Sequence, residues 1–425
     1  MASGRTLCVA LVIALVIALA AGAGTAAPQG GVSPKTFQAD PFIRIALVPS
    51  AQTVTVTATG AWRVYAADGR TLLYRPSARD GWRFDPVGGR VRGSSQSGFA
   101  MSARTGGVVL RPVEPGALMV INGKRYRGEL IVSPAGAALL VVNRLGIEDY
   151  LRGVVPLEIG RRASSEIAAV KAQAVAARTY AHTRIRTSTE RPFDLVGTVA
   201  NQVYGGADAE TPLTDRAVDE TRGIILFYGG RPIDAPYHAS CGGRTASASE
   251  IYAGDVDRPY LTSVSDRIPG SDSHYCDIYS RAAWIRTIEA REVNASIEKY
   301  LRDHVAGVRG VPGRVIAINE AGRTPSGRAA GIRIRTDRST YTARGNSARF
   351  VIRPPNGEIL PSTYFSVESE RAANGDLLRV IFRGRGNGHG VGMCQWGAIG
   401  RARSGQSWES ILQTYYPGTK LETIY

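Results

Sequence analysis

One uninterrupted stretch carries the clearest structural signal of the sequence: residues 164–186 read SSEIAAVKAQAVAARTYAHTRIR. It opens with Ser164 and Ser165, residue types that cap helix N-termini, and then continues rich in Ala without Gly or Pro. A helix that is apolar around most of its circumference is usually buried. We therefore expect a buried helix from Glu166 to about Arg186.

The sequence before this helix has the pattern of a β-rich region. Between turns, residues 42–142 alternate apolar and polar side chains, which predicts short strands of a mostly antiparallel sheet. The segments that carry this pattern are IRIALV, TVTVTATG, WRVYAADG, RTLLYR, GVVLRPV, LMVING, YRGELIVS and ALLVVN.

The sequence after the helix mixes both kinds of element. Strand and turn signals resume at residues 223–240, and residues 282–307 predict two helices or one broken helix. The strand-like segments VIAIN, GIRIRT, YTARG and LLRVIFRG follow, and residues 397–416 predict a final helical part. The expected fold class is α+β, with mostly antiparallel strands, an Ala-rich buried helix that carries site residues, and a β-rich N-terminal region.

The first residues have the pattern of a secretory signal peptide. Arg5 is followed by an apolar run from Leu7 to Ala20 and by small residues through Ala27. The run is short for a membrane-spanning helix, although an uncleaved anchor is the alternative. We expect residues 1–27 to be removed, so that the mature protein is exported and has no membrane attachment.

The chain is strongly basic. Its formal net charge is +16, and removal of Arg5 with the signal peptide leaves +15. Such a surface favours the binding of polyanions, which include nucleic acid and bacterial cell-wall polymers. No basic run carries the interleaved aromatic residues that grip single-stranded nucleic acid, and an exported protein meets the cell wall first. The expected partner is therefore the cell wall and not nucleic acid.

A candidate catalytic acid stands in residues 148–158, EDYLRGVVPLE, where an apolar approach ends with Glu158 just before a turn. Apolar surroundings disfavour the ionised carboxylate and raise its pKa, which suits a general acid near neutral pH. A solvated Glu at a strand end is the alternative. The residues alone leave both open.

The Ala-rich helix carries polar residues on two faces. At about 100° per residue, Lys171, Arg178 and His182 fall on one face and Gln173 on the opposite one. Buried cations need partners or a cavity. Lys171 and Arg178 therefore either pair with core carboxylates or line a binding site.

Two short pairs of His and Cys form a candidate metal site. His238 and Cys241 are followed at a distance by His274 and Cys276, the ligand types and number of a closed tetrahedral zinc site. A Cys241–Cys276 disulfide, natural in an exported protein, is the alternative, and free thiols are the third option. Four protein ligands would leave zinc no open position for water, so the metal would be structural.

Residues 384–398, GRGNGHGVGMCQWGA, are rich in glycine. Glycines permit positive φ values and close backbone approach, as in a loop shaped around a ligand or against another backbone. Lys and Ser/Thr are missing from the places that a phosphate loop requires. His389, Gln395 and Trp396 could offer hydrogen bonds and a flat face to a sugar, and a tight structural turn is the alternative.

Taken together and in this order, EDYLRGVVPLE, AVKAQAVAARTYA, YHASCGGRT, RPYLTSV, GRGNGHGVGMCQWGA and ILQTYYPGT resemble the stage II sporulation protein D / LytB family. The likeness runs from about Tyr126 to the C-terminus and more loosely back to Phe42. It implies a catalytic core over residues 143–425. Cys394 departs from the pattern, because related sequences often have Ser there, and residues 159–165 lack the usual acidic or aromatic character.

The resemblance implies a lytic transglycosylase that cleaves peptide-free peptidoglycan strands between N-acetylmuramic acid and N-acetylglucosamine. The family's catalytic Glu falls on Glu158. Some members hold zinc through His and Cys, which matches His238, Cys241, His274 and Cys276 in part. The candidate substrate-binding residues are Lys171, Gln173, Arg178, Tyr237, Ser240, His389 and Gln395.

Cleavage by a transglycosylase needs a single carboxylate, whereas hydrolytic glycosidases normally use two. Glu158 would protonate the glycosidic oxygen and then take a proton from the C6 hydroxyl that attacks C1, without a cofactor. Lys171 and Arg178 would bind the lactyl carboxylate. Two other classes stay open: a non-catalytic enhancer of a partner N-acetylmuramoyl-L-alanine amidase, and a zinc-dependent amidase.

Overall fold

The computed structural model describes residues 40–425 except 79, 186–190, 253, 255 and 256. The predicted signal peptide, residues 1–27, lies outside the described residues. No described helix has both the length and the hydrophobicity that a membrane span requires.

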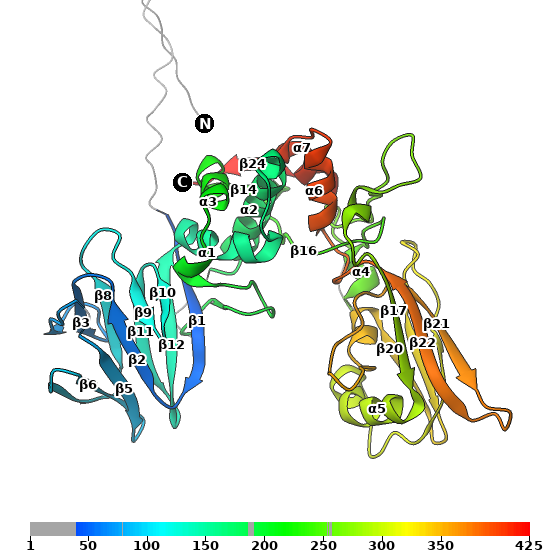
Figure 1. Cartoon of the computed structure of the whole chain (residues 1–425), viewed down its shortest axis with the longest axis horizontal. Coiled ribbons are helices and arrows are strands. Elements are labelled where there is room, and N and C mark those ends of the chain that lie inside the picture. The colour runs from blue at the N-terminus through cyan, green and yellow to red at the C-terminus, as the bar shows by residue number, and fades with distance from the viewer. Residues whose placement is uncertain (1–39, 79, 186–190, 253, 255–256) are drawn as a thin grey trace, which may run out of the picture. The chain divides into compact units, whose positions relative to one another are not determined.

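The alternating residues of the N-terminal region form two sheets, drawn blue to cyan in Figure 1. The seven-stranded sheet has the order β13-β1-β12-β11-β8-β3-β4, and the six-stranded sheet has the order β10-β9-β2-β5-β6-β7. The strands are β1 Phe42–Ala51, β2 Val54–Ala58, β3 Trp62–Ala66, β4 Leu72–Tyr74, β5 Trp82–Val87, β6 Arg90–Ser95, β7 Ala100–Arg104, β8 Val108–Pro112, β9 Met119–Ile121, β10 Lys124–Tyr126, β11 Glu129–Ala135, β12 Ala138–Gly146 and β13 Leu195–Val196.

These sheets have the pairing that the alternation predicts. Every described pair is antiparallel apart from β1 with β13. Apolar side chains of the two sheets share one core, in which the fully buried rings of Trp62 and Trp82 meet edge to face at 6.4 Å. The β-rich N-terminal region is therefore confirmed.

The Ala-rich stretch forms α2, Ile167–His182, after a 3₁₀ turn at Ser164–Glu166. Small side chains let neighbours approach it on several sides: α2 contacts α1 Ile147–Ile159, α3 Pro212–Glu220, β14 Ile224–Tyr228, α6 Gln395–Arg403 and α7 Trp408–Tyr415. Most of its residues are buried, as predicted. The same core cluster joins these helices to the N-terminal sheets.

The apolar approach to Glu158 is a helix, α1, rather than an extended strand end. It contains Pro156, which lacks an N–H and is costly inside a helix. Gly153 is required, because a Cβ there would lie 2.6 Å from the ring of Tyr204. The buried side chains of Leu151 and Val154 hold the helix against the core despite these residues.

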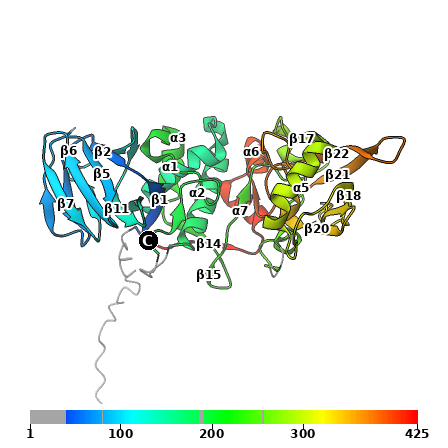
Figure 2. The same cartoon turned by 90° about the horizontal axis from the view of Figure 1, so that it is seen from below.

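Residues within 283–385 have a hydrophobic core of their own, which runs from Trp284 to Phe382. It lies inside the region 143–425 that the resemblance implied as one core. Two three-stranded sheets, β17-β22-β21 and β18-β19-β20, contribute to it together with α5. Figure 2 shows α5 beside β17 and β22. The bounds are β17 Ala283–Glu289, α5 Ala290–His304, β18 Val315–Glu320, β19 Gly331–Thr336, β20 Thr340–Arg344, η4 Gly345–Arg349, β21 Phe365–Arg371 and β22 Leu377–Arg385.

One helix prediction needs correction. Residues 282–307 begin with the strand β17, because Trp284 and Ile288 alternate with less buried residues along an antiparallel pair with β22, and only α5 is a helix. The predicted helical part, residues 397–416, is helical in the structure and falls on two helices, α6 and α7, which Gly405 separates with a φ of 80°.

Short elements connect these parts. Sheet β15-β14-β24 packs beside α2, and β16 pairs in parallel with β23. The remaining bounds are η2 Gly206–Ala209, β15 Arg231–Pro232, β16 Tyr237–His238, α4 Ala248–Ile251, η3 Tyr275–Ile278, β23 Met393–Cys394 and β24 Lys420–Thr423. With helices packed beside mostly antiparallel sheets, the predicted α+β class is confirmed.

Candidate active site

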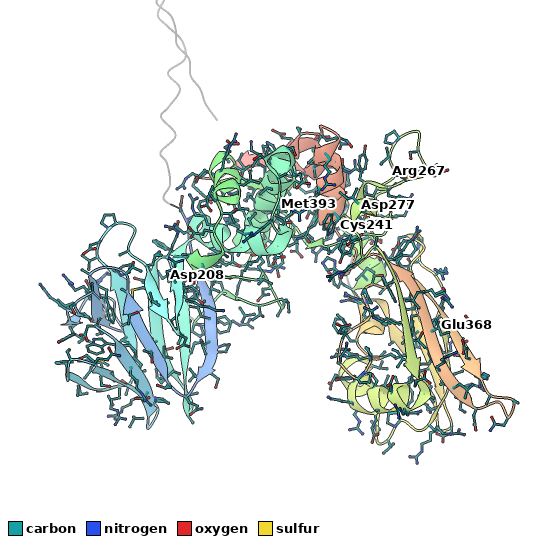
Figure 3. All side chains as sticks on the ribbon, viewed as in Figure 1. Asp208, Cys241, Arg267, Asp277, Glu368 and Met393 are labelled. Carbon is teal, nitrogen blue, oxygen red and sulfur yellow. The ribbon has the colours of Figure 1, made fainter. Side chains whose placement is uncertain are left out.

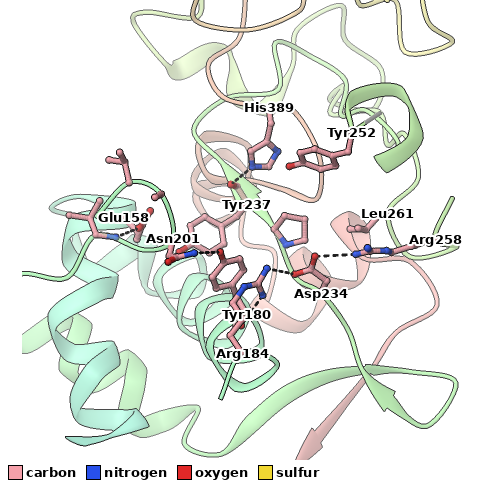
Figure 4. Close-up of a pocket in the computed structure, with 14 residues that line it drawn as sticks. Glu158, Tyr180, Arg184, Asn201, Asp234, Tyr237, Tyr252, Arg258, Leu261 and His389 are labelled. Carbon is pink, nitrogen blue, oxygen red and sulfur yellow. Dashed lines mark hydrogen bonds and ion pairs between the residues drawn. The ribbon is translucent and has the colours of Figure 1, made fainter. Parts of the chain in front are cut away.

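A cavity of about 530 Å³ opens beside the end of α1, where Glu158 lies (Figure 4). Its walls come from the ends of α1 and α2, from the segment after β13, and from the segments around β16, α4 and residue 389. The lining residues are Glu158, Tyr180, Arg184, Val199, Ala200, Asn201, Val203, Asp234, Pro236, Tyr237, Tyr252, Arg258, Leu261 and His389.

Glu158 lies in the last turn of α1 and is half-buried. Burial raises the pKa of its carboxyl, while hydrogen bonds from the Val203 N–H and the Tyr237 hydroxyl oppose the rise. The Val203 N–H donates to Oε1 at 2.9 Å. The negative end of the α1 dipole also disfavours a carboxylate at this position. The proton is thus held more tightly than by a solvated Glu, as a general acid requires.

The Tyr237 hydroxyl is oriented by a buried hydrogen-bond chain. Gln202 Nε2 donates to the Tyr237 hydroxyl oxygen at 3.0 Å, and Gln202 Oε1 accepts from Tyr150 at 3.0 Å. Because the phenol oxygen already accepts from Gln202, its own proton is free to point at Glu158. Tyr237 was predicted as a pocket residue and lines the cavity.

Gln395 and Gln173 lie behind Glu158 rather than on the cavity wall. Gln395 Nε2 donates to the Glu158 carbonyl oxygen at 3.0 Å and to Gln173 Oε1 at 3.2 Å. Gln173 is fully buried. Neither side chain lines the cavity, and Gln395 instead binds the main chain of the candidate acid.

His389 lines the cavity, as predicted for a pocket residue. Its Nε2 donates to the Tyr237 carbonyl oxygen at 2.9 Å, and its Nδ1 accepts from the Val391 N–H at 3.1 Å. Burial, joined by the nearby Arg349, lowers the pKa of His389 to about 4. The imidazole is therefore neutral and supports the strand that carries Tyr237.

Lys171 and Arg178 do not line the cavity, which corrects their predicted role. Lys171 Nζ lies 2.5 Å from Glu220 Oε2 of α3. The fully buried Arg178 binds both carboxylate oxygens of Glu148, at 2.8 and 2.7 Å. Of the two options that the sequence left open, pairing with carboxylates is the one observed.

The cations of the cavity are instead Arg184 and Arg258, which the sequence analysis missed. Arg184 Nη2 and Arg258 Nη1 bind the two oxygens of Asp234 at 3.1 and 3.0 Å (Figure 4). Arg258 belongs to the motif RPYLTSV, and Asp234 precedes Tyr237 by three residues. Arg184, Asp234 and Arg258 form no sequence pattern of their own. The signal available in the sequence was their position within or close to the motifs.

Ser240 supports the glycine-rich loop and does not reach the cavity. It is buried, and its main chain exchanges hydrogen bonds of 2.9 and 2.7 Å with Asn387. A Cβ on Gly392 would lie 2.0 Å from the Pro236 carbonyl oxygen, and Gly392 has a φ of 71°. The glycines therefore allow the loop to pack closely against another segment of backbone. This is one of the two explanations that the sequence left open for them.

Two of the four predicted metal ligands come together. Cys241 Sγ lies 3.6 Å from Cys276 Sγ, too far for a disulfide, whose S–S length is about 2.05 Å. His238 Nδ1 instead faces the Val391 carbonyl oxygen at 3.1 Å, and His274 Nδ1 lies 3.3 Å from Asp277. Cys394 and Asp266 complete the buried group in place of the histidines.

Comparison with known proteins matches two parts of the chain to family profiles. Residues 135–228, which contain α1, Glu158 and α2, match the family described as stage II sporulation protein. Residues 246–392 match a domain of unknown function. The second match includes the separate hydrophobic core.

Several curated proteins are similar over most of the chain. An uncharacterised protein of Brachyspira hyodysenteriae is 35% identical over 71% of this chain and 73% of its own length. The amidase enhancer of Bacillus subtilis is 31% identical over 64% of this chain, which spans only 40% of that relative. Stage II sporulation protein D of Bacillus subtilis is 30% identical over 66% of this chain and 75% of its own length. The motifs around Glu158 and this extended similarity show that the chain belongs to the stage II sporulation protein D family.

Proposed function

We propose that the protein is an exported lytic transglycosylase of peptidoglycan, with Glu158 as its single acid and base. Family membership and similarity to an amidase enhancer support a role in the cell wall. The observation that carries the proposal is a half-buried carboxyl of raised pKa on the wall of a cavity of about 530 Å³.

The second carboxylate on the cavity wall, Asp234, also favours a mechanism with a single catalytic acid. Asp234 is held between Arg184 and Arg258, so it is committed to ion pairs, whereas Glu158 contacts no cation among the described ion pairs. A hydrolase would need a second carboxylate to activate water or to form a covalent intermediate. A transglycosylase needs none, because the substrate's own hydroxyl is the nucleophile.

The proposed cleavage involves only Glu158 and atoms of the glycan strand. Glu158 gives its proton to the glycosidic oxygen as the bond to C1 breaks. The resulting carboxylate accepts the proton of the C6 hydroxyl on the same muramic acid as that oxygen bonds to C1. The products are a free N-acetylglucosamine hydroxyl and a 1,6-anhydro end, and Glu158 regains its proton.

Arg184 and Arg258 take the place that Lys171 and Arg178 held in the sequence-based mechanism. Arg184 and Arg258 place two guanidinium groups on the cavity wall. A charge-assisted bond from a guanidinium to the lactyl carboxylate of muramic acid would use this position. Strands without stem peptides expose that carboxylate, which favours them as substrates.

The test is to digest peptide-free glycan strands with the purified protein and to weigh the products. Anhydro-muramic ends are expected. Reducing ends, each heavier by one water, would contradict the mechanism. Glu158→Gln should lower cleavage by a factor of about 10² to 10⁴ without unfolding the protein. Glu220→Gln, an equally conservative change outside the cavity, serves as the control and should keep activity.

The second candidate is a non-catalytic wall protein that stimulates an N-acetylmuramoyl-L-alanine amidase. The similarity to the amidase enhancer of Bacillus subtilis favours it. Protein that binds glycan strands and accelerates a purified amidase, yet forms no new sugar ends, would support this candidate and exclude the first.

A further inference from the structure

A buried group of four metal-binding side chains lies outside the candidate active site. We propose that Cys241, Asp266, Cys276 and Cys394 bind one zinc ion in a closed structural site. Their ligand atoms all lie within 4.8 Å of one another, and all four residues are buried. In Figure 3 the labelled Cys241, Asp277 and Met393 mark three of the segments that supply them.

The distances within the group fit a tetrahedral zinc ion. Bonds of about 2.3 Å to sulfur and about 2.0 Å to oxygen separate two sulfurs by about 3.8 Å, and a sulfur from an oxygen by about 3.5 Å. The observed separations are 3.6 Å from Cys241 Sγ to Cys276 Sγ and 3.7 Å from Cys241 Sγ to Asp266 Oδ2. Zinc could therefore enter with small movements of these side chains.

Neighbouring groups orient the ligands as in a built metal site. Asp266 Oδ1 accepts from the Tyr415 hydroxyl at 2.7 Å and from Arg401 Nη2 at 3.2 Å, which leaves Oδ2 toward the thiols. Cys394 Sγ accepts from the N–H groups of Cys241 and Gly397, each at 3.2 Å. Such outer contacts hold metal ligands in place and stabilise thiolates.

The surrounding charges balance a zinc-bound state. Three thiolates, one carboxylate and Zn²⁺ sum to two negative charges, and buried groups of like charge need counter-ions. Arg401 contacts Asp266, and the fully buried Arg328 donates to the Cys241 carbonyl oxygen at 2.7 Å. Among the described residues, Arg328 Nε and Nη1 have no hydrogen-bond partner. An anionic metal site next to it would supply the negative charge that no described ion pair gives to this buried guanidinium.

The site joins the parts of the chain that hold the catalytic end of α1. Cys241 follows β16, Cys276 lies in η3, and Cys394 ends β23 directly before Gln395. Gln395 in turn donates to the Glu158 carbonyl oxygen. Four protein ligands leave no open position, so the metal would stabilise this region and take no part in cleavage.

The experiment measures zinc in the full mature chain after secretion and purification without reductant. One zinc per chain is expected by elemental analysis and by native mass spectrometry. Cys394→Ser and Asp266→Asn should lose zinc, and Tyr415→Phe should weaken zinc binding by about tenfold or more. His238→Gln and His274→Gln are the matched controls and should keep a full equivalent.

Cobalt(II) substitution of the wild type tests the ligand set even if the variants fail to fold. The thiolate-to-cobalt absorption should have the intensity of three thiolates in a tetrahedral field. Loss of zinc from the histidine variants but not from Cys394→Ser would overturn the assignment. A metal-free chain lighter by two hydrogens would overturn it in favour of a disulfide.

Discussion

Two glutamates of α1 have opposite electrostatic environments. Glu148 lies in the first turn, where burial alone would raise its pKa, but Arg178 and the Tyr425 hydroxyl outweigh burial and lower it. Glu158 lies in the last turn, where burial prevails and raises the pKa of its carboxyl. One residue is thereby suited to a permanent ion pair and the other to proton transfer.

The raised pKa of Glu158 predicts how cleavage depends on pH. The acid must be protonated at the start, so its active fraction falls as pH rises through the raised pKa. Above that pKa we expect the rate to fall by about tenfold per pH unit. Initial rates on peptide-free strands across a pH series check this, and a rate that climbs with pH through the neutral range would contradict it.

The raised pKa of Glu158 also predicts that the Glu158→Gln variant has a higher free energy of unfolding than the wild type. A folded-state pKa above the unfolded value means that folding binds protons, so the contribution of Glu158 to stability falls as pH rises between the two values. Above the raised pKa the wild type must bury a charge that Gln lacks. Denaturant unfolding across a pH series should show the stability advantage of the variant growing as pH rises and shrinking at acid pH.

Tyr237→Phe isolates the hydrogen bond to Glu158. The hydroxyl lowers the pKa of Glu158, so its loss should move the falling limb of the pH profile to higher pH. Tyr180→Phe is the control, because the Tyr180 hydroxyl accepts from Asn201 Nδ2 at 3.4 Å. An unmoved limb in Tyr237→Phe would show that this hydroxyl does not act on the acid.

At the scale of elements, α1 and α2 are joined by the buried pair of Arg178 and Glu148. Arg178→Met leaves Glu148 as an uncompensated buried charge and should cost about 3–5 kcal/mol of unfolding free energy. Lys171→Met removes a partly exposed pair on the same helix and should cost no more than about 1 kcal/mol. Denaturant unfolding of both variants measures the contrast, and equal losses would contradict it.

Most elements could be predicted from the sequence because their patterns are local. Alternation identified eight strands of the N-terminal sheets, β1, β2, β3, β4, β8, β9, β11 and β12, and the Ala-rich stretch identified α2. Helix α1 escaped because Pro156 and Gly153 oppose a helix locally, and only tertiary burial overrides them. Likewise, the pattern of residues 283–289 is ambiguous until β22 pairs with them.

The candidate site was predictable only where motifs mark it. Glu158, Tyr237 and His389 lie in quoted motifs and line the cavity. Arg184 and Asp234 meet there because the fold brings two chain segments together, and no local pattern records that meeting. The ligand set of the metal group shows the same limit, since Asp266 joins the cysteines through tertiary contacts alone.

At the scale of the whole molecule, the described residues have two main hydrophobic cores. Phe382→Ala empties space in the core of residues 284–382 and should cost about 3–5 kcal/mol. Hydrogen exchange should rise in β17, β21 and β22 while α1 and α2 stay protected. Leu151→Ala, in the other core, should show the reverse pattern, and uniform loosening in both variants would indicate a single cooperative unit.

The contact between Gln395 and the carbonyl of Glu158 spans 237 residues of chain. A chain that leaves the ribosome and crosses a membrane N-terminus first exposes Glu158 long before Gln395 and His389 arrive. In a chain exported as proposed, the full set of cavity residues would therefore assemble only after the region of residues 246–392 has emerged. The proposed glycan-cutting activity would then begin only outside the cell membrane.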